Sequence, residues 1–374
     1  MTKPKISIIV PVYNVESYVS QCLDSLLNQT MKEIGVICVN DGSKDNSLQI
    51  LREYAAKDDR VLVIDQPNSG VSIARNNALR YIRGEYYMFV DSDDWLDSET
   101  CEVTYNYAKQ NDADCLMFSY TKEFGSHSIV NHIFDKELLV WEKDEVLQNF
   151  HRRLYGPIGK ELAKPQDMDL LVTPCMQLFK SAKFANIEFV DIREVGTFED
   201  GLYQMVVYND CDRFVYIDKP YYHYRKTNAT SITTKYKSDL YEKYINLYSI
   251  IDSYILKYQL EVSYKDALNN RIAINTLALG LNSVHAPNCI INNVLLGGVN
   301  YLKSSRIRES LKLLDTGMMP FPWKVFYFLN KHRMKILLTL MLLIIEFART
   351  HKISRLRNEN QECKNKCNST RLQC

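Results

Sequence analysis

Three aspartates stand within four positions of the sequence, at Asp91, Asp93 and Asp94 in the stretch FVDSDDW. Carboxylates crowded in this way repel one another, so each raises the cost of ionising its neighbours. A cation bound between them removes that cost, and hard ions such as Mg²⁺ and Mn²⁺ prefer oxygen ligands of this kind. The alternative is a solvated loop after a strand, because Asp and Ser are good turn formers.

A second acidic pair, Glu199 and Asp200, stands in VGTFEDGLYQM. One interpretation of this pair is that both acids open a helix, where they favour the positive end of its dipole. A helix that begins at this pair would also hold both carboxylates rigidly.

The elements that must position these residues alternate along the first third of the chain. Apolar, β-branched runs predict strands near residues 6–14, 34–39, 61–65 and 85–90. Between them, apolar residues at helical spacing predict helices near residues 16–29, 47–57 and 71–84. This alternation predicts an α/β fold with a mostly parallel sheet flanked by helices.

Four polar clusters follow the four predicted strands: PVYN, NDGSKDNS, DQPNSG and DSDD. Ligands of such sheets bind beyond the carboxyl ends of the strands, so we expect the four clusters to meet in one crevice. The chain has no GxGxxG after its first strand and no GxxxxGK[ST], which excludes the dinucleotide fingerprint and the P-loop. A diphosphate would then be held through a divalent cation on the aspartates.

The stretches SIIVPVYN, VNDGSKDNS, NSGVSIARN and FVDSDDW, in this order over residues 5–97, resemble the inverting glycosyltransferases of family 2. These enzymes have the GT-A nucleotide-sugar-binding fold. Asn40 stands where the family often has Asp, and Ala78 where it often has Gly. Both positions flank the expected contacts, so neither departure puts the activity in doubt.

The resemblance implies a role for each matched residue. Most would contact the nucleotide-sugar donor: Pro11, Tyr13, Asp41, Asn68, Gly70, Arg75, Asp91 and Ser92. Tyr13 would lie near the base and Asp41 would accept a hydrogen bond from it. For Arg75 the alternative is a surface helix residue paired with a nearby acid. Asp93, with Asp91, would bind Mn²⁺ or Mg²⁺.

The resemblance also implies roles for residues beyond the first third. Asp200 would be the catalytic base and Glu199 would orient the acceptor or the base. His223 and Arg225 would lie in a segment that covers the donor diphosphate, with His223 as a further metal ligand. The alternative for His223 is a packed or hydrogen-bonded histidine.

The implied reaction is metal-dependent, inverting transfer of a sugar from a nucleotide-diphosphate donor, with UDP-sugar expected, to a glycan or lipid-linked acceptor of surface polysaccharide. One alternative is a nucleotide-sugar-binding or scaffold subunit without turnover, although such a subunit has no need of a base. A nucleotidyltransferase is less favoured, because PVYNVESY replaces the Gly-rich basic loop that it would place after the first strand.

Composition limits the partners and the location. The 374 residues include 46 basic and 45 acidic residues, so the chain as a whole is not built for nucleic acid. Ten cysteines without a CxxC pair argue against a zinc site or a disulfide framework. The first residues lack the features of a signal peptide, so we expect a cytoplasmic protein.

The sequence predicts four regions: the nucleotide-sugar-binding half at 1–120, the acceptor half with the base at 121–235, a helical domain at 236–320, and a basic and apolar segment with a polar tail at 321–374. The apolar core of the last region, 336–345, is too short to cross a bilayer. Its aromatic and basic flanks predict attachment to the inner face of the cell membrane. The alternative is a buried helix with charged ends.

Overall fold

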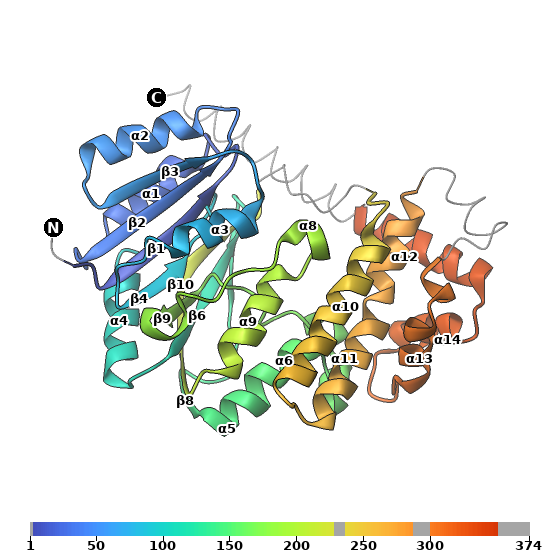
Figure 1. The fold of residues 1–374 in the computed structure, drawn as a ribbon. Coiled ribbons are helices and arrows are strands. Elements are labelled where there is room, and N and C mark those ends of the chain that lie inside the picture. Colours follow the sequence, from blue (N-terminus) through green and yellow to red (C-terminus); the bar gives the residue numbers. More distant parts are fainter. Residues whose placement is uncertain (1–2, 228–235, 287–299, 351–374) are drawn as a thin grey trace. The chain divides into compact units, whose positions relative to one another are not determined.

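The computed structural model of this protein describes residues 3–227, 236–286 and 300–350. It has two compact units: the first contains residues 1–154 and 170–228, and the second residues 155–169 and 229–374. Figure 1 traces the chain through both units. The polar tail predicted at 351–374 lies outside the described residues.

The first unit is built on a sheet whose order is β3-β2-β1-β4-β9-β6-β10-β5, with β7 paired to β6 and β8 to β10 (Figure 1). The strands are β1 (Ile6–Val12), β2 (Ile34–Asp41), β3 (Val61–Gln66), β4 (Tyr86–Phe89), β5 (Trp95–Leu96), β6 (Cys115–Glu123), β7 (Ser128–Asn131), β8 (Leu138–Glu142), β9 (Gln177–Lys180) and β10 (Arg213–Arg225). All four strands predicted from the first third are confirmed, and β1 and β4 are almost completely buried.

The order of the first four strands creates a crevice. The chain moves outward from β1 to β2 and β3, and then crosses back to place β4 on the other side of β1. These neighbours are all parallel, and parallel crossovers are right-handed, so α3 covers the face opposite α1 and α2. The reversal of direction falls between β1 and β4, and ligands bind outside the carboxyl ends of strands at such a point.

The sheet is parallel only in part. The short strand β9 is inserted between β4 and β6 and is antiparallel to both, while β5, β7 and β8 also pair antiparallel. The expectation of a mostly parallel sheet therefore holds for β1 to β4, and the second half of the sheet is mixed. Because β9 opposes both neighbours, β6 and β10 run in the same direction as β4.

Helices flank this sheet. Those of the first third are α1 (Val19–Leu27), α2 (Ser47–Lys57) and α3 (Val71–Leu79), and those that follow are α4 (Thr100–Gln110), α5 (Lys143–Val146), α6 (Arg152–Tyr155), α7 (Ser181–Phe184), α8 (Ile192–Val195) and α9 (Glu199–Asn209). Helix α3 packs on β1 and β2, and α2 on β3. The apolar spacing of α1 buries Val19, Cys22, Leu23 and Leu26, as the helical pattern predicts.

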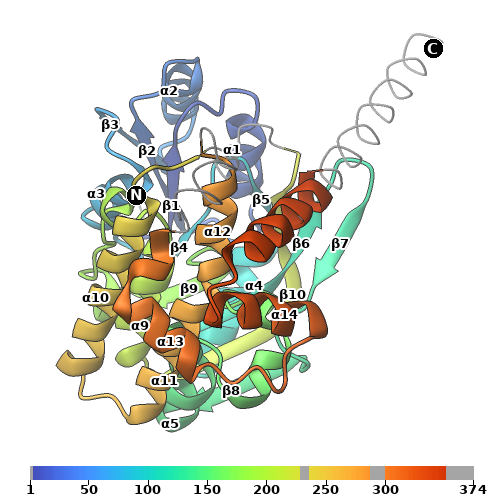
Figure 2. The ribbon, with the colours of Figure 1, turned by 90° about the vertical axis from the view of Figure 1, so that its right-hand side faces the viewer.

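The second unit is helical. It contains α10 (Leu240–Lys257), α11 (Val262–Ile274), α12 (Thr276–Val284), α13 (Ser305–Leu313) and α14 (Phe321–Lys331), followed by a further helix over residues 335–350. Figure 2 shows α13, α14 and this last helix in orange and red. No helix among the described residues is both long and apolar enough to cross a membrane.

Residues 155–169 join this helical unit, whereas the sequence analysis places them within the region 121–235. The buried guanidinium group of Arg271 donates hydrogen bonds to the carbonyl oxygen of Tyr155 at 3.0 Å and to Asp169 at 2.9 Å. Gly156 lies so close to α11 that a Cβ there would be 2.1 Å from the carbonyl oxygen of Ala267. This segment is therefore fixed to α11 by contacts that its sequence position does not reveal.

Candidate active site

Hydrogen bonds join the loop after β1 to the loop after β2. Asn14 donates its backbone N–H to Ser43 Oγ at 3.1 Å and accepts from the Lys44 N–H at 2.8 Å. Pro11 is half-buried at the end of β1, and the Tyr13 side chain is 45% exposed beyond it. The predicted meeting of the polar clusters at one edge is thus confirmed for the first two loops, and the Tyr13 ring is accessible to a ligand.

Asp41, the last residue of β2, positions the loop after β3. Its carboxylate accepts hydrogen bonds from the backbone N–H groups of Ser69 at 2.7 Å and Gly70 at 2.8 Å, and from Gln66 Nε2 at 2.8 Å. The Asn68 side chain donates to the Asp41 carbonyl oxygen at 3.1 Å. Asp41 and the Asn68–Gly70 loop therefore form one structural unit, with at most one acceptor site of the carboxylate left for a base.

Two glycines make this loop arrangement possible. Gly42 has φ of +68° and Gly70 has φ of +92°, conformations that favour glycine. A Cβ on Gly42 would lie 2.7 Å from the backbone nitrogen of Asn68, which would push the two loops apart. The backbone conformation and the close approach of the two loops therefore both require glycine in NDGS, and the backbone conformation favours it in NSG.

Arg75 connects the two acidic motifs. Its Nη1 donates to Asp200 at 2.6 Å and its Nη2 to Asp91 at 3.1 Å, so one guanidinium group bridges residues that are 109 positions apart. The side chain is only 4% exposed. The ring centroids of Phe89 and Phe189 lie 5.8 and 5.3 Å from its Cζ, so the cation makes cation–π contacts with both rings.

Burial alone would lower the pKa of Arg75, but the charges of Asp200 and Asp91 more than offset this and raise it above its ordinary value. The guanidinium group therefore stays charged at every pH at which the protein is folded. The alternative of a surface helix residue paired with an acid holds for the pairing and is wrong about the surface position, because the side chain is buried at the junction of the two motifs.

One face of α3 holds the segment that carries the ED pair. Ser72 Oγ accepts the backbone N–H of Ile192 at 3.1 Å. Asn76 binds both backbone groups of Phe189, through Nδ2 to its carbonyl oxygen at 2.9 Å and through Oδ1 to its N–H at 2.7 Å. Positions 72, 75 and 76 share a face of a helix, so a single helical face fixes residues 189–200 beside the aspartate loop.

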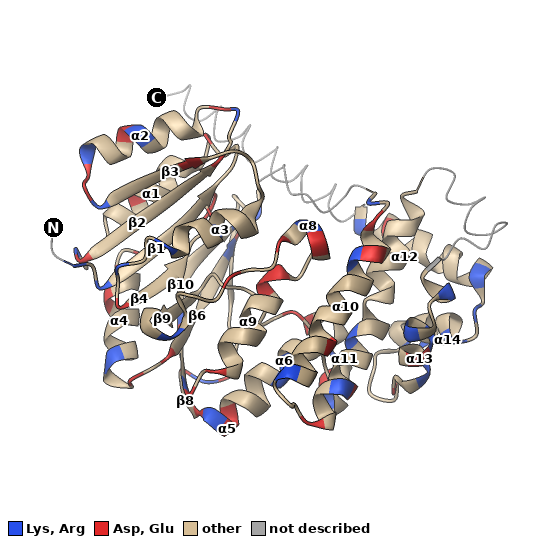
Figure 3. Cartoon of the chain, viewed as in Figure 1, with Lys and Arg blue, Asp and Glu red and all other residues tan. Residues whose placement is uncertain are grey.

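Glu199 and Asp200 form the first turn of α9, and red marks acidic residues at this point and on α8 (Figure 3). The residue before them, Phe198, has φ of 70°, which is strained for a non-glycine residue. Its ring covers Gly201, where a Cβ would be 2.2 Å from Phe198 Cζ. This local fold places Asp200 against Arg75 and requires the glycine in the sequence EDG.

The surroundings of this pair favour protonated carboxyl groups. Burial, and then the charge of Asp200, raise the pKa of Glu199 to about 7. Burial also raises the pKa of Asp200, although the charge of Arg75 opposes the effect. The Asp200 side chain remains 27% exposed, so solvent or an acceptor can reach it. A carboxylate with a raised pKa and an open side has the properties of a general base.

The DSDD loop is held from β10. Tyr222 Oη donates to Asp94 Oδ2 at 2.7 Å and accepts the backbone N–H of Asp91 at 3.2 Å. Asp94 also accepts the backbone N–H of Arg225 at 2.8 Å. Asp94 is buried, and burial followed by the charges of Asp91 and Asp93 raises its pKa to about 8.

Asp94 does not cap a helix, because no helix begins directly after it. Residues Trp95–Leu96 form β5, and α4 begins only at Thr100. Asp94 instead shapes the loop by accepting hydrogen bonds from β10. The buried Ser92 and the half-buried Asp91 and Asp93 lie in the same loop, as the DxD pattern predicts.

The side chains of His223 and Arg225 lie on the face of β10 opposite that of Tyr222. They form a stack of four side chains with Trp95 and Tyr18. The rings of His223 and Trp95 are parallel with centroids 5.0 Å apart, and the Arg225 guanidinium carbon lies 4.6 Å from the Trp95 ring and 4.9 Å from the Tyr18 ring. Arg225 Nε donates to the carbonyl oxygen of Asp93 at 2.7 Å. The stack therefore supports the DSDD loop.

Both ring nitrogens of His223 have carboxylate partners, Glu123 at 2.8 Å and Asp97 at 3.2 Å. In this arrangement the imidazole is a hydrogen-bonded and packed histidine, which is the alternative weighed from the sequence. A role for His223 as a metal ligand would require these contacts to open.

The donor set suits a divalent cation that also binds a ligand. Within residues 3–227, 236–286 and 300–350, no three His, Cys, Asp or Glu side chains lie close enough together to hold a metal ion alone. Mg²⁺ sites commonly use one or two carboxylates together with substrate phosphates, however, and Asp91 and Asp93 supply two. Their effect on the Asp94 pKa shows how strongly negative this loop is.

Sequence reasoning missed several residues that position the site. Ser72 and Asn76 carried a weak signal, since they are polar residues on the same face of α3 as Arg75. Tyr222 alternates with His223 and Arg225 in YYHYR, which would have placed it on the other face of a strand. Tyr18 and Phe189 carried no local signal, because only packing brings them to the site.

Comparisons with known proteins agree with this architecture. Residues 7–157 match the family model of glycosyl transferase family 2. The glycosyltransferase GlyA of Streptococcus pneumoniae is 34% identical over 225 residues, which is 59% of this chain but only 30% of GlyA. EpsH of Bacillus subtilis is 29% identical over 83% of this chain and 82% of its own length.

The crystal structure of S. aureus TarS 1–349 in complex with UDP-GlcNAc shares the fold, with a TM-score of 0.65, 21% sequence identity and 92% of each chain covered. The motifs, the arrangement of the sheet and the match over residues 7–157 all lead to one assignment. Residues 7–157 therefore carry a glycosyl transferase family 2 domain, and the chain has the GT-A fold with a helical C-terminal region.

Proposed function

We propose that this protein is a metal-dependent, inverting glycosyltransferase that moves a hexosyl or N-acetylhexosaminyl group from a UDP-sugar to a glycan or lipid-linked acceptor of bacterial surface polysaccharide. It would work in the cytoplasm at the inner face of the cell membrane. The observation that carries the proposal is the bridge made by Arg75, because it joins the donor-side Asp91 to Asp200 at the switch point of the sheet.

Asp200 is the proposed base. In inverting transfer the acceptor hydroxyl attacks the anomeric carbon from the face opposite the nucleotide, and its proton passes to a carboxylate. The ion pair with Arg75 fixes the orientation of Asp200, while its exposed edge leaves one oxygen accessible to the acceptor. Burial raises its pKa, which makes it a stronger base than an exposed aspartate. Glu199 would orient the acceptor.

The donor diphosphate would lie against the DSDD loop, with Asp91 and Asp93 holding Mn²⁺ or Mg²⁺. The metal ion would supply Lewis-acid stabilisation of the charge that grows on the leaving diphosphate. The hydrogen bonds from Tyr222 and Arg225 keep this loop in one conformation, so the two carboxylates are preorganised before the donor arrives.

The nucleoside would occupy the crevice between the loops after β1, β2 and β3. Tyr13 offers an exposed ring, and Asp41 would use its remaining acceptor capacity for the base. TarS, which shares the fold, is described in complex with UDP-GlcNAc, and this supports the choice of a uridine nucleotide. Pro11, Asn68 and Gly70 would shape the pocket around the nucleoside.

The test is a thermal-shift titration of the purified protein with Mn²⁺ and the diphosphates of uridine, guanosine, thymidine and cytidine. A ligand that binds only the folded state raises its melting temperature. We expect UDP to stabilise the protein only when Mn²⁺ is present, and Asp93→Ala to lose this effect. Asp59→Ala, the same change at an exposed position before β3, is the control and should respond like the parent protein.

The competing function is a nucleotide-sugar-binding or scaffold subunit without turnover. It predicts the same thermal shift, so transfer must be measured as well, with UDP-sugar donors and a membrane extract as the source of acceptor. Stabilisation by UDP without transfer of any sugar would favour the scaffold. Absence of a nucleotide-dependent shift for all four diphosphates would contradict the proposed function itself.

A further inference from the structure

The helix over residues 335–350 uses one of its faces for packing within the helical unit. Leu338, Thr339 and Leu342 are buried there. Leu342 reaches α12 so closely that a Cβ on Gly280 would lie 2.8 Å from its Cδ2. On the same side, Glu346 pairs with His285 at 3.2 Å and with Arg349 at 2.9 Å. This side of the helix therefore packs against α12 and the residue that follows it.

The opposite face of this helix is apolar and exposed. Ile336, Leu340, Ile344 and Phe347 follow one another at spacings of four, four and three residues, so they form one stripe. Ile344 is 69% exposed and Phe347 72%, and Leu337 lies beside them. The charged residues of 335–350 are Lys335, Glu346 and Arg349, and none of them is exposed. A continuous apolar surface of this kind marks an interaction site.

Helix α14 and the turn after it add positive charge. Its exposed side carries Phe321, Lys324, Phe328 and Lys331, and the exposed Arg333 follows in the turn. Residues 316–345 contain four Lys and Arg residues and no Asp or Glu. Each basic residue near an anionic lipid surface strengthens binding by about fivefold, so an apolar stripe beside unopposed cations complements an anionic bilayer.

The part of this helix that the structure describes is shorter than a bilayer core is thick. Its 16 described residues extend over about 24 Å at 1.5 Å per residue, which is less than the roughly 30 Å of a hydrocarbon core. Leu340, Ile344 and Phe347 also line a hollow of about 550 Å³ together with Val284 of α12. An acyl chain could fill this hollow, while the helix itself would lie in the plane of the interface.

We propose that the apolar stripe of the helix over 335–350, together with the exposed side of α14, docks on the surface of an anionic lipid bilayer. The surface is separate from the residues assigned to donor binding and transfer. It gives a structural basis for the membrane attachment predicted from sequence, and it corrects the alternative of a buried helix, because only one side of the helix is buried.

The proposal is tested by flotation of the full-length protein with unilamellar vesicles of phosphatidylcholine alone and of phosphatidylcholine with phosphatidylglycerol in equal parts. We expect the protein to float with the anionic vesicles and far less with the neutral ones. Ile344→Asp combined with Phe347→Asp should lower the bound fraction at least tenfold. Lys324→Glu combined with Lys331→Glu should remove the preference for anionic vesicles.

Val262→Asp is the matched control, because Val262 is 76% exposed in the same unit but stands apart from the stripe. It should float like the parent protein. The proposal is overturned if the parent protein ignores anionic vesicles or if the stripe variant floats unchanged. It is also overturned if light scattering shows a dimer that the stripe variant dissociates, since a second copy would then cover the face. Stabilisation by UDP and Mn²⁺, measured on the same preparations, reports the donor site independently.

Discussion

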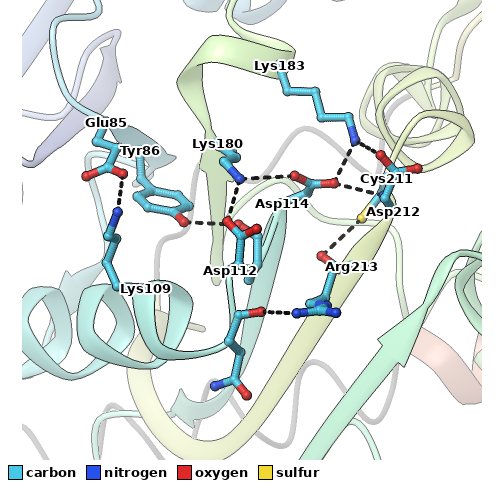
Figure 4. A network of polar contacts seen from close by, with 12 residues as sticks. Glu85, Tyr86, Lys109, Asp112, Asp114, Lys180, Lys183, Cys211, Asp212 and Arg213 are labelled. Carbon is cyan, nitrogen blue, oxygen red and sulfur yellow. Dashed lines mark hydrogen bonds and ion pairs between the residues drawn. The ribbon is translucent and has the colours of Figure 1, made fainter.

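Two clusters of charged side chains lie at opposite ends of the strands of the same sheet. They differ in how completely their charges are paired. The first is the active site, at the carboxyl ends of β1 to β4 and β10. The second is a polar network at the starts of β4, β6 and β10, shown in Figure 4. We call it the edge network, and its charged members are Glu85, Lys109, Asp112, Asp114, Lys180, Lys183, Asp212 and Arg213.

The edge network is balanced. Lys183 contacts both Asp114 and Asp212, and Lys180 contacts Asp112 at 2.8 Å. Its four acidic residues face four basic ones. The active site instead has five carboxyl groups, and the guanidinium group of Arg75 pairs with two of them, Asp91 and Asp200. Arg225 contacts the DSDD loop through its backbone N–H to Asp94 and through Nε to the Asp93 carbonyl oxygen. The other carboxyl groups are those of Asp93, Asp94 and Glu199.

The pKa values move in opposite directions in the two clusters. In the edge network, hydrogen bonds from lysines lower the pKa values of Glu85, Asp112 and Asp212. In the active site, burial and neighbouring acids raise those of Asp94 to about 8 and Glu199 to about 7. One cluster therefore stabilises the fold at neutral pH, and the other holds excess negative charge that a cation or a proton would relieve.

The largest expected effect comes from removing the proposed base. Asp200→Asn should lower the rate of sugar transfer by roughly 10² to 10⁴, because an amide cannot accept the acceptor proton. Stabilisation by UDP and Mn²⁺ should persist, since the donor side is unchanged. Asp212→Asn removes a carboxylate from the edge network instead and should leave transfer intact. Equal loss of transfer in both variants would remove the distinction between the clusters.

Next in size is the loss of the bridging cation. Arg75→Met should lower the free energy of unfolding at pH 8 by up to about 3–5 kcal/mol, because it leaves the partly buried carboxylates of Asp91 and Asp200 without the cation that they share. Urea unfolding followed by circular dichroism measures the change. Adding Asp200→Asn to this variant should restore part of the stability, since it removes one of the stranded charges. Failure of the double variant to recover would mean that lost packing, rather than charge, explains the effect.

The pH dependence of stability separates the two clusters. The folded pKa of Glu199, about 7, lies above its ordinary 4.5, so its contribution is full below pH 4.5 and is lost as the pH rises through 7. Glu199→Gln should therefore gain stability relative to the parent protein between pH 5 and pH 8, by at most about 1.4 kcal/mol per pH unit.

The comparison for this experiment is Glu85→Gln in the edge network. The pKa of Glu85 is lowered, so its contribution is present above pH 4.5 and is lost only as the pH falls below that value. Its variant should show a constant offset from the parent protein between pH 5 and pH 8. The difference in free energy of unfolding between variant and parent should change with pH for Glu199→Gln and stay constant for Glu85→Gln. The opposite result for either variant would contradict the pKa shifts given for the two clusters.

The smallest effects belong to single cations of the edge network. Lys183→Met should cost about 1 kcal/mol or less, because Asp212 is exposed and Lys180 still neutralises the buried Asp114. Lys109→Met, at a more exposed pair with Glu85, should not change stability measurably. A loss for Lys183→Met as large as that for Arg75→Met would show that Lys180 does not compensate for the missing charge beside the buried Asp114.

The sequence alone determined the alternation of strands and helices in the first third and the loops that carry the chemistry. Hydrophobic periodicity indicates which side of a strand or helix is apolar, and this local property is the same before and after folding. Chain order then placed Asp41, Arg75 and the DSDD loop after strands that run in parallel, so their shared edge could be predicted. The ED pair was also found from the sequence, through its resemblance to the family and not through spacing by itself.

Only the tertiary structure decided how these residues are paired. The bridge from Arg75 to Asp91 and Asp200, the Tyr222 contact with Asp94, and the insertion of β9 between β4 and β6 all join distant parts of the chain. Such contacts depend on strand order and on the packing of side chains between elements. Local patterns carry no record of either, because hydrophobic periodicity states only that a face is buried and not what buries it.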